Sequence, residues 1–185
     1  MTFPTFSTGE VLTSAAMNAV GLWLVHDETL GNNLGSFTPA SAVFSSTYDN
    51  YLVTYTGGAC SAQGDIGMIL GATTSGYAHS VIYTGWSNAP TVAAAGAVSG
   101  AGAASWGRAG IAESDSCFLR LDIFSPNLPK RTIAWGAFVG SDSTRVGGSF
   151  SGFLANTTAY TNFTLTPSAG LLSGGVVSVF GYNKG

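Results

Sequence analysis

The sequence predicts an all-β protein: a jelly-roll-like antiparallel β-sandwich preceded by a short helical arm. Three observations predict this fold class. Short apolar runs alternate with turn residues along most of the chain, and glycine is abundant, at 26 of 185 residues. Only 8% of the residues are charged, against about 25% in typical soluble domains. A chain of this length and composition is expected to hold eight to ten short strands.

The C-terminal segment, residues 145–185, carries the clearest strand pattern. Its apolar runs are rich in β-branched and aromatic residues and are bounded by Gly, Asn and Ser, which is the signal of strands joined by turns. The final run is apolar on both faces, so we expect a strand in the interior of a sheet. The three predicted strands are residues 150–154, 163–165 and 176–182.

The preceding part of the chain contains further strand signals. Residues 117–124 alternate most cleanly: apolar side chains point one way, and Arg120 and Asp122 point the other. Gly57-Gly58 has the composition of a turn, and residues 74–76 have that of a hairpin turn between two strands. The predicted strands are 22–25, 51–55, 66–70, 77–83, 117–124 and 133–139, with the hairpin joining 66–70 to 77–83.

Residues 1–21 differ from the rest and form a predicted arm, with residues 22–185 as the β domain. Thr13 is a suitable N-cap and Gly21 a suitable C′ residue for a helix of about two turns, which is unstable alone. The arm is therefore expected to dock on a larger assembly. The side chains predicted to anchor it are Phe3, Phe6, Glu10, Leu12 and Met17.

Charge and cysteine content limit the partners. The net charge of −3 makes nucleic acid an unsuitable partner, and a surface so poor in charge favours association between copies. Cys60 and Cys117 lack metal-site spacing and are expected to be small buried residues. There is no secretory leader pattern, and the small-sided tract 89–104 does not resemble a membrane span.

No pattern of catalytic residues stands out, so we expect no enzyme, cofactor or metal. His26 and His79 are the two candidate neutral-pH bases, and each is expected to be structural. Residues 148–152 have the spacing of a nucleophile elbow but carry Phe150 where Ser is required. Glu113 and Asp115 form a close acidic pair, interpreted as a solvated turn, with a calcium site as the alternative.

Aromatic residues supply the remaining candidate site. Tyr77, His79, Trp86, Trp106 and Arg108 lie in and around predicted loops, where such residues can stack on sugar rings or form protein interfaces. The alternative is that the tryptophans fill the core, as expected for Trp23 and Trp135. The Ala/Gly/Ser-rich segment 89–110 is either a surface loop or a place where a partner's backbone approaches closely.

The arm carries a resemblance to a known class of proteins. Residues 6–19, FSTGEVLTSAAMNA, resemble the GE-x-L-T-x-A-x-x-N-A opening of many bacteriophage tail and other virion structural proteins. Residues 46–53 and 152–182 are similar to parts of small phage fibre-like proteins. The resemblance implies a non-enzymatic virion component with threefold symmetry, and does not by itself place it on tail or head. Together with the predicted arm and the charge-poor β domain, it leads us to expect a homotrimeric tail fibre or host-contact protein that is held to other phage proteins by its arm. A head decoration protein that stabilises the capsid is the alternative. A host-surface glycan is the ligand that the loop aromatics would suit.

Overall fold

A computed structural model of the chain describes residues 21–85, 99–142 and 144–183. The predicted helical arm and its anchoring side chains therefore lie outside the described residues. The described part is all-β, and every strand pairing is antiparallel. Its strands are β1 (Leu22–Thr29), β2 (Asn50–Cys60), β3 (Gly64–Leu70), β4 (Tyr77–Gly85), β5 (Ser99–Ala103), β6 (Trp106–Ala112), β7 (Cys117–Phe124), β8 (Thr132–Asp142), β9 (Thr144–Leu154), β10 (Phe163–Pro167) and β11 (Leu172–Tyr182).

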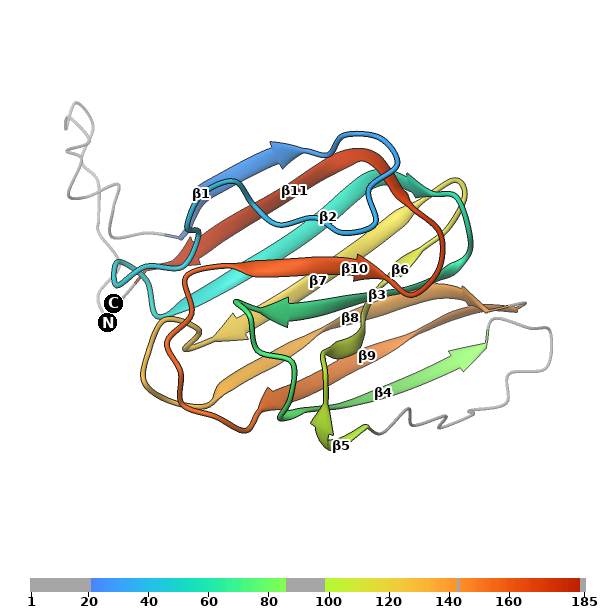
Figure 1. Ribbon diagram of the computed structural model, residues 1–185. Coiled ribbons are helices and arrows are strands. Elements are labelled where there is room, and N and C mark those ends of the chain that lie inside the picture. The colour runs from blue at the N-terminus through green and yellow to red at the C-terminus, as the bar shows by residue number, and fades with distance from the viewer. Residues whose placement is uncertain (1–20, 86–98, 143, 184–185) are drawn as a thin grey trace, which may run out of the picture.

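One long sheet organises these strands, in the order β1-β11-β2-β7-β8-β9-β4 with β5 at the far edge (Figure 1). The three C-terminal runs all form strands, as predicted. The last of them, β11, pairs with β1 on one side and β2 on the other, which confirms its interior position. The apolar face of each strand follows from its alternation: in β7, Leu119, Leu121 and Ile123 are fully buried.

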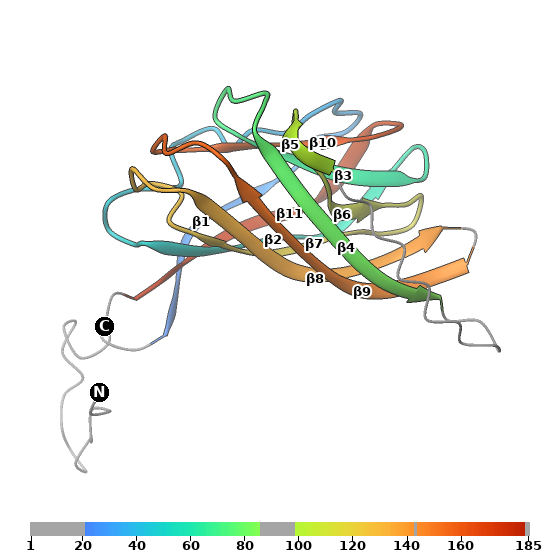
Figure 2. The ribbon, with the colours of Figure 1, turned by 90° about the horizontal axis from the view of Figure 1, so that it is seen from below.

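A second layer covers one face of this long sheet. In this layer β3 pairs with β10 on one side and with β6 on the other, and the last residues of β6 also pair with the start of β7. Figure 2 shows β3, β6 and β10 on one side of the long sheet. Residues 110–112 of β6 pair with β3 on one side and β7 on the other, and the first of them is Gly110, opposite both Ile66 and Leu119. A Cβ there would lie 2.5 Å from the Phe118 carbonyl oxygen, so this position requires glycine.

The hydrophobic core lies between the two layers and forms a single cluster. Tyr51 and Tyr55 of β2 and Met68 and Leu70 of β3 are fully buried members of it, and the Tyr51 ring packs on Phe44 at 4.8 Å between centroids. The loop between β1 and β2 closes the open edge of β10, because Phe37 forms a bridge with Leu165. Cys60 and Cys117 are free and buried, as predicted.

Two sequence predictions about turns were wrong. The strands predicted as a hairpin, 66–70 and 77–83, do not pair: β3 joins β6 and β10, whereas β4 joins β9 and β5. The turn at 74–76 instead carries the chain from one layer to the other. Gly57-Gly58 does not end a strand but forms a bulge inside β2, where Gly57 has a φ of 72°.

The bulge in β2 lies against a second pair of glycines in β11. Gly174 and Gly175 have φ values of 62° and 77°, and a Cβ on Gly175 would lie 2.5 Å from the backbone nitrogen of Gly58. The Tyr55 hydroxyl donates a hydrogen bond to the Gly174 carbonyl, at 2.9 Å. Glycine is therefore needed at 175 for both conformation and space, and at 174 for conformation alone.

Replacing these two glycines by alanine should separate the two requirements. Gly174→Ala has no atom within 4 Å of the new Cβ, so it should cost only the left-handed strain of about 1–2 kcal/mol. Gly175→Ala adds a clash with the β2 backbone and should cost a further ~1–3 kcal/mol. Urea unfolding of both variants at one protein concentration measures the difference. Equal losses would show that the close approach of β2 and β11 carries no energetic weight.

Candidate contact face

The face of the long sheet that the second layer does not cover is apolar. Nine large apolar side chains are exposed among the described residues. All of them except Leu171 belong to strands of this sheet and point to its uncovered side. We call this surface the outer face. Its exposed apolar side chains are Leu22 and Leu24 on β1, Phe124 on β7, Ile133, Trp135 and Val139 on β8, Phe153 on β9 and Ile82 on β4.

Strand register aligns these side chains in rows across the sheet. One row runs from Phe124 through Ile133 to Phe153. A neighbouring row places Asp122 opposite Trp135, which lies opposite Ser151. Directly opposed side chains on one face are close enough to touch. The outer face is therefore continuous across β7, β8 and β9, with Ile82 on β4 at one side and Leu22 and Leu24 on β1 beyond β2 and β11.

A small polar group lies near the middle of the outer face. Tyr182 of β11 donates a hydrogen bond from its hydroxyl to the Asp122 carboxylate, and Arg120 lies two residues away on the same side of β7. Partial burial, together with the hydrogen bond to Asp122 and the negative charge of Asp122, raises the pKa of Tyr182 to about 12. The phenol thus remains a donor at neutral pH, and the group holds one positive and one negative charge.

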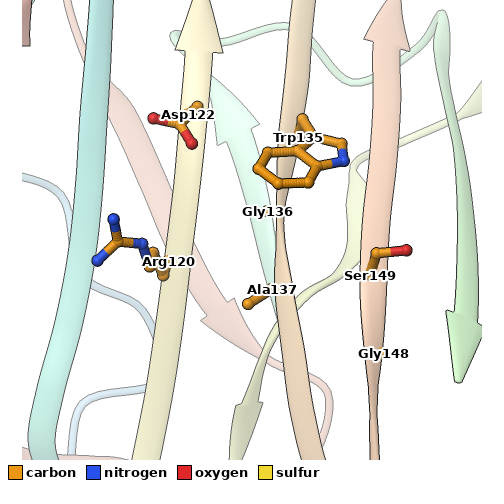
Figure 3. A pocket seen from close by; sticks show the side chains of 7 residues that line it. All are labelled: Arg120, Asp122, Trp135, Gly136, Ala137, Gly148 and Ser149. Carbon is orange, nitrogen blue, oxygen red and sulfur yellow. The ribbon is translucent and has the colours of Figure 1, made fainter. Parts of the chain in front are cut away.

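Beside this group the outer face has a shallow depression of about 340 Å³. Figure 3 shows Arg120 and Asp122 on one strand, the Trp135 ring on the next and Ser149 on the third. Trp135 is 55% exposed, so its indole ring is available to a partner. Aromatic and Arg side chains in this setting are the residue types that dominate binding surfaces.

The sequence predicted Trp135 as a core residue, and this was wrong. Trp135 points to the same side as Ile133, which is 52% exposed, whereas Ala134 between them points inward and is fully buried. Both sides of β8 are apolar, so periodicity alone could not indicate which side is covered. The usable signal was the pairing of β8 with β7, because Trp135 is opposite the charged Asp122.

The candidate contact residues predicted from the sequence are located elsewhere. Tyr77 and Trp106 are fully buried, with ring centroids 5.4 Å apart in an edge-on arrangement. Tyr77 accepts a hydrogen bond from the Leu70 backbone at 2.7 Å. The Trp106 indole donates to the Phe153 carbonyl at 3.2 Å, over Gly152. For these two residues the core interpretation holds, and the surface-contact interpretation was wrong.

His79 and Arg108 lie near this aromatic pair, and Trp86 is outside the described residues. The His79 ring is stacked on Phe150, at 5.8 Å between centroids, and is only 9% exposed. Arg108 is half-exposed and forms an ion pair with Asp65, with 3.2 Å between Nε and the carboxylate oxygen. The structure therefore brings Tyr77, His79 and Trp106 together between the two layers, and of the candidates that it describes leaves only Arg108 accessible.

Other chemically active groups are dispersed. Within the described ranges, no cluster of three or more His, Cys, Asp or Glu residues could hold a metal ion. His26 contacts Glu28 at 3.1 Å at the edge strand β1. Glu113 begins the turn between β6 and β7, where its backbone nitrogen donates to the Ser116 carbonyl at 2.8 Å, which confirms the predicted turn. Burial raises the pKa of the Cys117 thiol.

The described segments contain no helix with the length and apolarity needed to cross a lipid bilayer. Comparison of the chain with models of protein families, with curated proteins and with solved structures finds no match.

Trp106 and Arg108 should differ sharply in their effect on stability, although they lie on the same strand. Trp106→Ala should reduce the free energy of unfolding by about 3–5 kcal/mol, because it opens a large cavity in the core. Arg108→Ala removes only a partly exposed ion pair and should cost less than about 1 kcal/mol. Denaturant unfolding monitored by circular dichroism tests both. A loss of similar size for the two variants would contradict the assignment of Trp106 to the core.

His79 should make the fold sensitive to mild acid. Burial lowers the pKa of His79 from its ordinary 6.5, and the nearby Arg108 charge lowers it further. The unfolded chain therefore binds this proton more readily than the folded chain, so stability is full above about pH 6.5 and falls as the pH drops below that value. His79→Phe should flatten the loss of melting temperature between about pH 7 and pH 5. An unchanged pH profile would show that His79 is not the responsible group.

Proposed function

We propose that this chain is a non-enzymatic structural protein of a bacteriophage virion. In this proposal it forms a homotrimer, is anchored to other virion proteins by residues 1–21, and serves as a small tail fibre or host-contact component. The observation that carries the proposal is the uncovered apolar outer face, which a protein operating alone in water would not be expected to expose. The resemblance of residues 6–19 to virion proteins supports the same assignment.

The proposal also covers the type of β-sandwich that the two layers form. We infer that the long sheet and the β10-β3-β6 layer together form a jelly-roll-like sandwich. Antiparallel pairing throughout, the pairing of Gly110 with both β3 and β7, and the single core between layers support this description. Such folds serve in many capsid and sugar-binding domains, which is an analogy of fold and does not by itself identify a ligand.

The low charge of the chain supports assembly over catalysis. With 8% charged residues, the surface lacks the repulsion that keeps copies apart. The exposed Trp135 and the neighbouring Arg120 offer a contact for a protein or a host-surface glycan. A glycan would require the Trp135 ring to remain open in the assembled protein, whereas self-association would cover it.

The arm can be tested by deletion on intact particles. Removing residues 1–21 should leave a folded β domain, because β1 begins at Leu22 and no core residue precedes it among those described. The truncated protein should no longer join virions, measured by immunoblot of purified particles. Incorporation at the normal level would contradict the arm's anchoring role.

Labelling of intact particles tests where in the virion the protein lies. Gold-labelled antibody against the β domain should decorate the tail. Labelling of the head alone would instead favour the decoration protein, and absence of the protein from purified virions would contradict both assignments. A full-length chain that retains its arm is the matched control for each measurement.

A further inference from the structure

We propose that the outer face of the long sheet is the surface through which copies of this chain pack against one another. This inference rests on the proposed homo-oligomer and adds the partner, a second copy, and the side chains that meet it. Three properties of the face support it: the distribution of its exposed apolar side chains, its area and its charge.

Exposed large apolar side chains of the face occur on β1, β7, β8, β9 and β4, whereas β11 and β2, between β1 and β7, contribute none. The most exposed side chains are Ile82 at 58%, Leu24 at 56% and Trp135 at 55%. Leu24 lies on β1, Trp135 on β8 and Ile82 on β4, so they mark the two ends and the interior of the strand order. Leu171, in the turn before β11, is the one other large apolar side chain among the described residues that is comparably exposed.

The area of the face suits a stable interface. Seven strands spaced about 4.8 Å apart give a width of roughly 30 Å, and seven residues at about 3.3 Å each give a length of roughly 23 Å. The product is on the order of 700 Å². The whole face thus approaches the ~800 Å² that each partner buries in a standard protein interface, and a cyclic trimer would divide it between two neighbours, with about 350 Å² facing each.

The charge of the face suits a second copy better than another class of partner. Among the residues whose side chains are described, which leaves out residues 141–146, its charged side chains are Asp27 near one edge and the adjacent pair Arg120 and Asp122 on β7. Two copies therefore meet without large repulsion, and Arg120 of one copy can pair with Asp122 of the next. A membrane of anionic lipid or a nucleic acid would call for a basic surface, which this face does not provide.

Threefold symmetry would divide the face into two complementary halves. Each interface in a cyclic trimer is heterologous, so two different patches meet. The half made of β1, β11 and β2 then faces the half made of β8, β9 and β4 on the next copy. β7 lies between them in the strand order, which brings Arg120, Asp122 and the hydrogen-bonded Tyr182 nearest to the axis.

Sedimentation of the full-length chain tests this inference. The wild-type protein should have a mass about three times the chain mass of 18.8 kDa at micromolar concentration. Trp135→Glu and Leu24→Glu each place a charge in the proposed interface and should raise the concentration for half-dissociation at least tenfold. Leu171→Glu is the matched control: Leu171 is 39% exposed but lies in the turn before β11, outside the strands that form the face, so it should leave the mass unchanged.

Two further variants control for general effects of substitution and for failure to fold. Trp135→Phe retains an aromatic side chain and should remain assembled, which separates loss of the contact from a general effect of substitution. Circular dichroism checks that the charged variants fold. If either of them does not, Ile82→Glu on β4 repeats the test. Acrylamide quenching of tryptophan fluorescence should rise on dilution as Trp135 becomes accessible, and this rise should be absent in Trp135→Phe.

The outcomes distinguish this inference from the proposed function. An oligomer that persists in Trp135→Glu, Leu24→Glu and Ile82→Glu would overturn the assignment of the face while leaving a virion oligomer standing. A wild-type monomer at micromolar concentration would overturn self-association through this face. That conclusion would hold whether residues 1–20 or a different protein covers the face instead. Absence from the virion, tested separately, would overturn the proposed function without affecting the sedimentation result.

Discussion

The alternation of side chains along a β-strand is the constraint on which this structure depends. Successive residues point to opposite sides of a sheet, and the long sheet has apolar side chains on both. The inward set, including Leu119, Leu121 and Ile123, is covered by β3, β6 and β10. The outward set remains uncovered, because no other described element of the chain lies over it. The same sequence pattern thus produces a core on one side and an open apolar surface on the other.

Glycine makes this arrangement possible at the places where backbones come closest. Gly110 allows β6 to approach β7 where it also pairs with β3, and Gly175 allows β11 to lie against the bulge of β2. Gly152 leaves room for the Trp106 ring, and Gly181 for the ring of Tyr48. The abundance of glycine therefore has a specific physical role in a sheet that bends and changes partners. It also explains why Gly57-Gly58, which has the composition of a turn, lies within a strand.

Trp106 and Trp135 differ in burial, and this difference separates a structural side chain from one that can contact a partner. Trp106 has the surroundings of a structural residue, with its indole hydrogen donated to a backbone carbonyl. Trp135 has an exposed ring beside an Arg, an Asp and a hydroxyl group. Both are flanked by small residues in the sequence, so their immediate neighbours do not distinguish them. The difference arises from which side of which sheet receives the second layer.

The sequence by itself determined the all-β class, the three C-terminal strands, the interior position of β11, the sides of β7 and the buried state of both cysteines, because these depend on local periodicity and composition. Tertiary structure alone decided that β3 and β4 do not form a hairpin, that Tyr77 and Trp106 are internal, and that Trp135 faces outward. The physical reason is that strand pairing joins segments far apart in the chain. A period of two assigns side chains to two faces, but only the placement of the second layer determines which face is buried.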